Sequence, residues 1–298
     1  MEFLRQASAI VRWNFLGFHK NPRIILTFLF SFILCFFLSD RALLVADYYG
    51  SSMQALEPFI WTFGDATSIL LSSLLLILLF IDLPKLTPFT PYMLLRTRKA
   101  CWLLAQLCYI FLVTVGYMLY VLLVTSLLCM QKTYAGNLWS KTAALFAYSS
   151  MGDKFSVPST VKVMESTTPW GCSMQMVALL VCYALTLSFF MLYFQMRMGK
   201  KAGIAAGLCY SLFGFLLDPD TLAKILHKEE YEMFLVRRIT GWISPLNHAT
   251  YGMHDFGYDV LPSVGQSCLL FLLLLFAMSL CSFHILKRYN FSSFTGEA

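Results

Sequence analysis

The chain has 298 residues, of which 58% are hydrophobic and only 13% are charged, and its mean hydropathy is +0.68. A single soluble core of this length could not bury so much apolar surface, so the composition excludes an ordinary soluble domain and predicts a membrane protein. The net charge is +6 at pH 7, but the basic residues stand at the ends of apolar runs, which favours membrane topology over nucleic-acid binding as their explanation. The nine cysteines form no CxxC pair and are expected to be packing residues.

The first 23 residues predict an amphipathic helix on the membrane surface. Apolar side chains recur at helical spacing from Phe3 to Phe18, and three basic residues alternate with them, where they would contact lipid headgroups. We therefore expect an elbow helix over residues 1–23, lying on the inner leaflet.

Six apolar segments follow as candidate membrane crossings. They are residues 24–44, 59–81, 101–129, 172–196, 202–217 and 263–286. At about 1.5 Å per residue, all but the fifth reach across a hydrocarbon core of about 30 Å. The expected fold class is all-α, a polytopic membrane protein with six transmembrane helices in a single transmembrane domain that covers residues 1–298.

The segment 82–100, between the second and third crossings, is short, basic and rich in proline. It carries four lysine and arginine residues against one acid, Asp82, so it should face the cytoplasm. Pro91 can begin a helix, because its missing N–H donor is harmless in a first turn. We expect a short helix from Tyr92 to Lys99 at the inner membrane surface. More than half of the 22 basic residues fall on this side together with both chain ends, so both termini are expected in the cytoplasm.

The expected outer segments differ in character. Residues 45–58 are predicted to be a simple loop, whereas residues 137–148 carry apolar and aromatic side chains typical of an interfacial helix. Residues 218–262 begin with a helix start at 218–220 and continue on an amphipathic pattern. Two interpretations of 218–262 stay open, a segment that re-enters the membrane between the fifth and sixth crossings and a helix on the outer surface.

Polar residues on the second crossing are the candidates for lining a path. Four of them fall within an arc of about 120° of one helix, and an ionisable residue inside a crossing is a functional candidate. They are Thr62, Asp65, Ser68 and Ser72. The structural alternative is an ion pair between Asp65 and Arg41, which lies near the outer end of the first crossing.

Small residues form one narrow face of the fifth crossing, which is typical of close helix packing. They are Gly203, Gly207, Ser211 and Gly214.

Motifs for enzymatic chemistry are missing from the sequence. No GxxxxGK[ST] phosphate loop occurs, so ATP hydrolysis by that machinery is not expected of this chain alone, and no GxSxG motif indicates a hydrolase. The spacing of His248, His254 and Asp255 does not fit a metal site. We expect no catalytic residue, no metal site and no directly bound cofactor.

The order of these elements resembles the permease subunit of a type-2 ATP-binding-cassette (ABC) exporter in its small bacterial form. The likeness covers nearly the whole chain. It is strongest in TPFTPYMLLRTRKACWLLAQLCYIF, residues 87–111, which is similar to the loop and third-crossing entry of those permeases, and in ISPLNHATYG, residues 243–252, which resembles the turn before their sixth crossing.

The resemblance implies a multi-pass protein of the bacterial inner membrane that works with partners. A second permease chain, identical or related, would complete the path, and separate ABC ATPase subunits would bind ATP and Mg. The segment 82–100 would be the coupling loop, with the elbow helix helping to form the contact. Its residues for coupling to the ATPase would be Pro91, Tyr92, Leu95, Arg96, Arg98 and Lys99.

Other functions are separated by different sequence features. A secondary transporter should show internal repeats and several charges inside the membrane, whereas this chain shows one convincing charge, Asp65. A non-transporting membrane scaffold or immunity protein stays open. The residues also leave the substrate open between a peptide, a lipid, a drug and an ion.

Overall fold

The computed structural model describes residues 2–86, 89–149, 152, 154, 161–217, 222, 233–257, 260–287 and 289. The described part is all-α apart from one two-stranded sheet. The larger helices are α1 (Glu2–Phe15), α2 (Pro22–Tyr48), α4 (Ala66–Leu79), α6 (Lys99–Leu128), α10 (Pro169–Met198), α11 (Lys200–Leu216), α13 (Met233–Ile243) and α15 (Val264–Leu286). The shorter elements are η1 (Phe18–Lys20), β1 (Met53–Gln54), α3 (Glu57–Thr62), α5 (Thr90–Arg96), η2 (Met130–Lys132), β2 (Thr133–Tyr134), α7 (Lys141–Tyr148), α9 (Val161–Ser166), α14 (Pro245–Ala249) and η4 (Tyr251–Met253).

Four helices within the described residues are long and apolar enough to cross a membrane, namely α2, α6, α10 and α15. This is the pattern of a multi-pass membrane protein. The two remaining expected crossings correspond to shorter helices, because α4 has 14 residues and α11 has 17.

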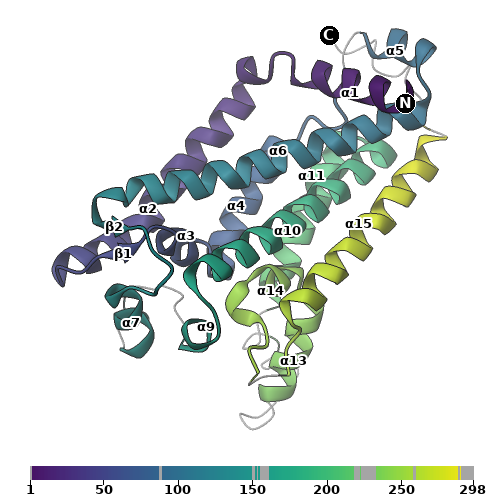
Figure 1. Ribbon diagram of the computed structural model, residues 1–298. Helices are drawn as coiled ribbons and strands as arrows, with labels where there is room; N and C mark the ends of the chain where they lie inside the picture. Colours follow the sequence, from purple (N-terminus) through teal and green to yellow (C-terminus); the bar gives the residue numbers. More distant parts are fainter. Residues whose placement is uncertain are drawn as a thin grey trace.

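Helix α10 lies at the centre of the bundle. It packs against α4, α6, α11 and α15 (Figure 1). Of the most apolar stretch of α10, 56% is buried inside the protein, against 17% for α15. Gly199 joins α10 to α11 with φ of 93°, a left-handed conformation that glycine adopts without a steric penalty, so the two helices fold back on one another directly.

Capping residues explain where several helices begin. Asn21, Thr168 and Ser244 each accept a backbone hydrogen bond at a helix start and are each followed by proline, whose fixed φ suits the first helical position. Ser263 and Gln266 form a reciprocal capping box at the start of α15.

The second expected crossing differs from its prediction, because residues 59–81 do not form one continuous helix. The chain breaks after α3 at Phe63–Asp65, and α4 begins at Ala66. Gly64 is a poor helix former, and the Asp65 carboxylate accepts a hydrogen bond from the Ser68 backbone N–H at 3.3 Å, which starts a new helix.

The segment 45–58, predicted to be a simple outer loop, is more ordered than predicted. Helix α2 extends to Tyr48, and β1 pairs in parallel with β2, with Met53 opposite Thr133. An ion pair of 2.8 Å between Lys132 and Asp47 joins the same two regions. The predicted simple loop is therefore wrong, and the cause is pairing with a segment some 80 residues away in the sequence.

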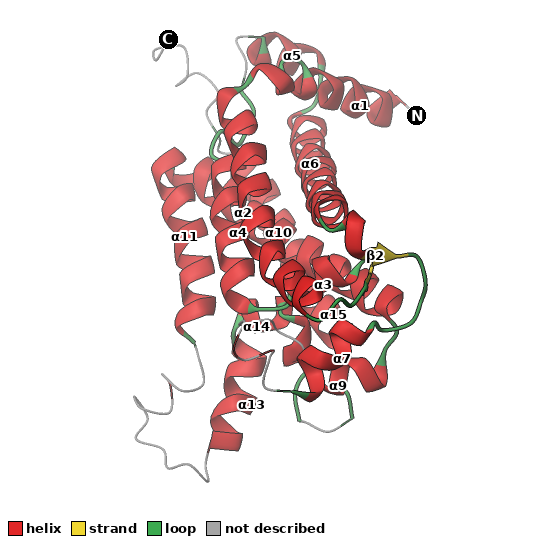
Figure 2. Cartoon of the chain, turned by 90° about the vertical axis from the view of Figure 1, so that its left-hand side faces the viewer, coloured by secondary structure: helices red, strands yellow, loops and turns green. Residues whose placement is uncertain are grey.

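The two ends of the bundle carry different elements. Helices α1 and α5 lie at one end, and α3, α7, α9, α13 and α14 lie toward the other (Figure 2). Trp102 at the start of α6 stacks on Tyr289, 6.5 Å between ring centroids, so the chain beyond α15 returns to the end that holds α1. In the predicted outer segment 218–262, residues 218–221, 223–232 and 258–259, including the predicted helix start at 218–220, lie outside the described residues.

Candidate functional site

The predicted coupling residues lie at the α1 end on one outward surface. Helix α5 turns Met93 and Leu94 toward the core, where they are half-buried. The coupling candidates all have exposed side chains; they are Pro91, Tyr92, Leu95, Arg96, Arg98 and Lys99. Arg98 also precedes α6 as its N-terminal flanking residue. The surface formed by these six residues is called the α5 surface below.

Helix α1 supports α5. Trp13 packs edge-on against Phe89 with 5.5 Å between the ring centroids. Ala7 and Ile10 of α1 are buried, and α1 packs along the first turns of α6. The amphipathic pattern predicted for residues 1–23 therefore has its apolar stripe partly against protein.

The chain before α5 is fixed by contacts that the sequence analysis missed. Arg23 at the start of α2 forms an ion pair with Asp82. The side chain of Gln106 accepts a hydrogen bond from the Lys85 backbone N–H at 3.0 Å and donates one to the Lys85 carbonyl at 3.3 Å. Burial lowers the pKa of Lys85, and the charge of Asp82 acts in the opposite direction. A glutamine inside an otherwise apolar crossing was the available signal for this contact.

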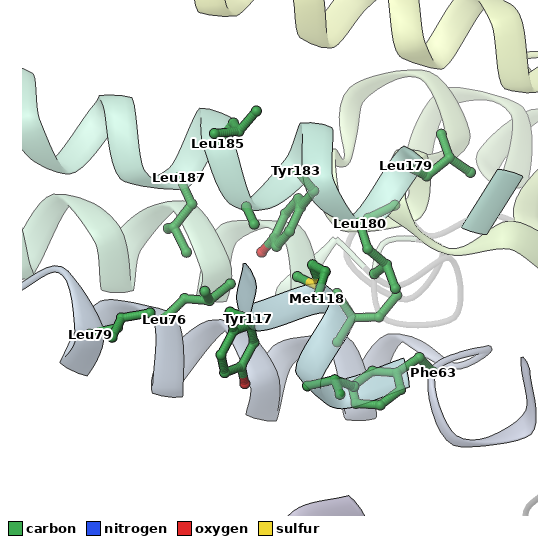
Figure 3. Close-up of a cluster of buried hydrophobic side chains, with 14 of the residues drawn as sticks. Phe63, Leu76, Leu79, Tyr117, Met118, Leu179, Leu180, Tyr183, Leu185 and Leu187 are labelled. Carbon is green, nitrogen blue, oxygen red and sulfur yellow. The ribbon is translucent and has the colours of Figure 1, made fainter. Parts of the chain in front are cut away.

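The four predicted path residues do not share one helix face. Thr62 belongs to α3 and lies 3.4 Å from the Ser39 hydroxyl of α2. Ser72 lies on α4, and its hydroxyl is 3.3 Å from that of Tyr117. Ser31 donates to the same Tyr117 oxygen at 2.8 Å, so this tyrosine joins α2, α4 and α6 within the interior. Figure 3 shows Tyr117 beside Leu76 and Leu79 of α4 in this packed region.

Asp65 borders two neighbouring cavities at the end opposite the α5 surface. The larger has a volume of about 610 Å³ and the smaller about 300 Å³. The larger volume lies within the range of roughly 300–1,000 Å³ that is usual for small-molecule sites. Of the other path candidates, Ser68 borders the smaller cavity, whereas Thr62 and Ser72 are buried against the partners described above.

The larger cavity is formed where four parts of the chain meet. These four are α3 with the break before α4, the segment from Trp139 through α9 to the first turns of α10, the C-terminal end of α11, and the segment 246–253. Trp61, Trp139, Phe215 and Tyr251 supply aromatic walls. Asp65 is the one charged side chain among the described residues that line it.

Arg41 borders the smaller cavity together with Asp65. Within the described residues, however, no ion pair within 4 Å joins them, and the Asp65 carboxylate accepts one hydrogen bond, from its own helix. The structural alternative proposed from the sequence is therefore not formed at contact distance, although the two charges share a cavity.

A buried carboxylate, Glu57, organises the same end of the bundle and was not identified from the sequence. It accepts hydrogen bonds from the Gln54 N–H at 2.9 Å, from the Ser140 N–H at 2.8 Å and from the Ser140 hydroxyl at 2.6 Å. Burial raises the pKa of Glu57, and these hydrogen bonds act against that rise. The side chain thus fixes the start of α3 to the start of α7.

Two histidines meet one serine between the segment 245–254 and α15. His248 Nδ1 and His254 Nε2 lie 2.8 and 2.9 Å from the Ser267 hydroxyl oxygen. The opposite ring nitrogens face backbone carbonyl groups, Trp242 for His248 and both Thr250 and Tyr251 for His254. A nitrogen that faces a carbonyl oxygen must carry the hydrogen and donate it. In a neutral ring the other nitrogen is then an acceptor, so both nitrogens that face Ser267 are acceptors. The single hydroxyl hydrogen of Ser267 can therefore bond to only one of them at a time.

This histidine pair is expected to make the protein sensitive to acid. Burial is the main cause that lowers the pKa of both histidines, so the folded state takes up protons less readily than the unfolded chain. The stability that the neutral histidines contribute is therefore fully present above pH 6.5, the ordinary pKa of histidine. It is lost as the pH falls below 6.5 toward the lowered pKa of the folded state. We expect the thermal unfolding midpoint in detergent to decrease from about pH 8 to about pH 5.5.

Replacing both His248 and His254 with glutamine should remove most of that pH dependence, because the amide does not titrate. His19→Gln, at an exposed position near the other end of the bundle, is the matched control and should leave the dependence in place. An unchanged pH profile in the double variant would contradict the assignment.

No group of three or more metal-binding side chains occurs in the part of the chain that the structure describes.

The small-residue face of α11 is its buried face. Gly203, Gly207, Ser211 and Gly214 are the buried residues of that helix. A Cβ at Gly207 would lie 3.0 Å from Met191 of α10, and a Cβ at Gly214 would lie 2.8 Å from the Leu246 side chain. These residues bring α11 close to α10 and α14.

Together these features describe an all-α protein with the helices of a multi-pass membrane protein, an exposed basic surface at one end and a cavity at the other. Comparison of the chain with protein-family models, with curated proteins and with solved structures gave no match. Its resemblance to ABC permeases therefore rests on the sequence features alone.

Proposed function

We propose that this protein is the permease subunit of an ATP-driven ABC exporter of the type-2 class. Two permease chains, identical or related, form the translocation path across the bacterial inner membrane. Separate ABC ATPase subunits bind ATP and Mg and dock on the cytoplasmic side. The chain itself hydrolyses nothing and transmits the movement of the ATPase pair to the path.

The observation that carries this proposal is the α5 surface. Tyr92 is 68% exposed and Leu95 is 84% exposed, although both are apolar or aromatic and stand beside Arg96. Aromatic, apolar and arginine side chains together are typical of protein–protein contact sites. The surface is also anchored at both ends, because Phe89, directly before α5, packs against Trp13 of α1, and the 30-residue helix α6 begins at Lys99.

The membrane arrangement follows from the same proposal. The short helices α4 and α11 complete six crossings with the four long helices. Helix α1 is the elbow at the inner leaflet, and both termini lie in the cytoplasm. Residues 244–254, which are largely buried among α4, α10, α11 and α15, are the innermost part of a re-entrant segment, where protein shelters the irregular backbone.

Leu95→Glu is expected to remove ATPase subunits from the purified complex. Glutamate replaces the apolar contact of Leu95 with a charge that must lose its hydration on binding, which weakens binding by at least about tenfold. The tagged protein is purified from its native cells in mild detergent, its bound proteins are identified by mass spectrometry, and ATP hydrolysis is measured. Since Leu95 is 84% exposed, the substitution should leave the fold of the permease unchanged.

Leu138→Glu is the matched control, because Leu138 is 77% exposed and lies on the segment before α7 at the opposite end. That variant should retain the ATPase subunit. Replacing Arg96, Arg98 and Lys99 together with glutamine should lower both recovery and ATP hydrolysis. If the wild-type chain is recovered alone and without ATP hydrolysis, the proposal is wrong, and a secondary transporter or a scaffold takes its place.

A further inference from the structure

The larger cavity combines an apolar body with a single negative charge. Its described lining includes the apolar side chains of Ile60, Met176 and Leu246 in addition to the four aromatic residues, and Asp65 is its one charged residue. Asp65 is only half-buried and has no ion-pair partner among the described residues, so its carboxylate keeps unused acceptor capacity.

The helix ends around the cavity, taken together with Asp65, also make the electrostatic potential in the cavity negative. Gly214 to Leu217, at the C-terminal end of α11, border the cavity, and a helix C-terminus carries about half a negative charge on its free carbonyl groups. The N-terminus of α4 contributes about half a positive charge, which is smaller than the full charge of Asp65 that caps it. The sum favours a cation.

The aromatic walls are held in fixed positions and suit the same ligand. The Trp139 indole N–H donates to the Thr167 carbonyl at 2.7 Å, and Trp61 packs edge-on against Phe146 at 4.9 Å between ring centroids. The Tyr251 hydroxyl donates to the Gln175 side-chain oxygen at 2.6 Å. Ring faces attract cations and also pack against apolar groups, which is how proteins bind organic ammonium compounds.

We propose that this cavity is a binding site for lipophilic monovalent cations, with Asp65 as the counter-charge and the aromatic residues around it as the apolar contact. Binding requires only this chain. That the bound cation is also the exported substrate rests on the proposed function.

Arg41 provides an internal test, because it is the one basic residue among the described residues that line the two cavities. Its positive charge opposes a cation in the neighbouring space. Removing Arg41 should therefore strengthen cation binding, whereas removing the charge of Asp65 should weaken it.

The experiment compares two ions of the same shape and opposite charge. Radiolabelled tetraphenylphosphonium is bound to the purified, immobilised full-length chain in detergent, and binding is counted only where excess unlabelled tetraphenylphosphonium displaces it. Tetraphenylborate, the anion of the same shape, is tested in a separate assay with its own radiolabel, because the two ions form an insoluble salt when they are mixed. We expect saturable binding of the cation and no saturable binding of the borate.

Asp65→Asn should lower the affinity for tetraphenylphosphonium by at least about tenfold. Asparagine caps a helix as well as aspartate does, so α4 should still form. Arg41→Gln should bind tetraphenylphosphonium more tightly than wild type, and it serves as the control for a change of charge in the same region. Equal affinity in wild type and Asp65→Asn, or saturable binding of the borate, would overturn the proposal.

These results separate the binding site from the exporter. Charge-selective binding without any recovered ATPase would retain the site and reject the proposed function. Recovery of an ATPase with no charge-selective binding would do the reverse.

Discussion

Replacing Gly214 with alanine is expected to destabilise the protein, although the same change is stabilising in most helices. The added Cβ would lie 2.8 Å from the Leu246 Cβ and 3.1 Å from the Leu246 backbone nitrogen. A backbone atom cannot rotate away as the end of a side chain can, so α14 must shift. We expect a loss of about 1–3 kcal/mol in the free energy of unfolding, as for other overpacked contacts.

The measurement is the unfolding midpoint of the purified protein in detergent, compared with that of Gly116→Ala. Gly116 lies within α6, it is exposed, and no atom lies within 4 Å of a Cβ built there. Alanine at that position should stabilise the helix by about 0.5–1 kcal/mol, because it has a better helix propensity than glycine. The two variants should thus change stability in opposite directions. A gain at both positions would show that α11 and α14 are not in close contact.

The Gly214 substitution has a second consequence at the cavity. Ser244 donates a hydrogen bond to the Gly214 carbonyl at 2.8 Å, and both Gly214 and Leu246 border the larger cavity. Displacement of α14 would therefore move the wall formed by the segment 246–253. The loss of stability in Gly214→Ala should be accompanied by weaker tetraphenylphosphonium binding.

Glu57→Ala is expected to cost at least about 3 kcal/mol of unfolding free energy. The substitution leaves the N–H groups of Gln54 and Ser140 and the Ser140 hydroxyl without their acceptor in a buried position. The Ser140 hydroxyl oxygen also accepts from the Ala143 N–H, so the start of α7 should loosen as well. Hydrogen exchange followed by mass spectrometry should show faster exchange in residues 53–57 and 140–148.

Two further variants identify the cause. Glu57→Gln keeps the shape of the side chain but replaces one acceptor oxygen with an NH₂ donor that faces other donors. Its free energy of unfolding should therefore lie between those of wild type and Glu57→Ala. Glu165→Ala removes an exposed carboxylate on α9, whose hydrogen-bond partner among the described residues is the Tyr148 hydroxyl at 3.2 Å, and it should change stability little. Equal effects of Glu57→Ala and Glu165→Ala would contradict the role assigned to Glu57.

The helical class could be predicted from sequence because its signals are local. Apolar length located α2, α6, α10 and α15, although α2, α6 and α10 extend beyond the predicted bounds, and the glycine spacing of α11 indicated the face that the structure buries. Proline in the segment 82–100 indicated that a short new helix would start there, but α5 covers Thr90–Arg96 and not the predicted 92–99, because Thr97 and Arg98 are extended before α6 begins at Lys99. In these cases the periodicity or the backbone chemistry of one segment determines the result.

The contacts between distant segments could not be predicted in this way. Hydropathy gave residues 59–81 as one crossing because Phe63 and its neighbours are apolar, although Gly64-Asp65 is a recognisable helix break and start. Glu57 and Ser140 are 83 residues apart, and nothing in the local sequence around either residue indicates that the two are in contact. The meeting of His248, His254 and Ser267 likewise depends on how α15 packs against the segment before it.

The position of α10 in the chain has a consequence for biosynthesis. Helices α2, α4 and α6 are synthesised before α10, and hydroxyl contacts through Tyr117 already join all three. The first half of the chain can therefore satisfy these buried polar groups among its own helices while the rest is still being translated. Helices α11 and α15 pack chiefly against α10, so the second half assembles around a helix that is inserted just before them. The order of translation thus matches the order in which the packing partners become available.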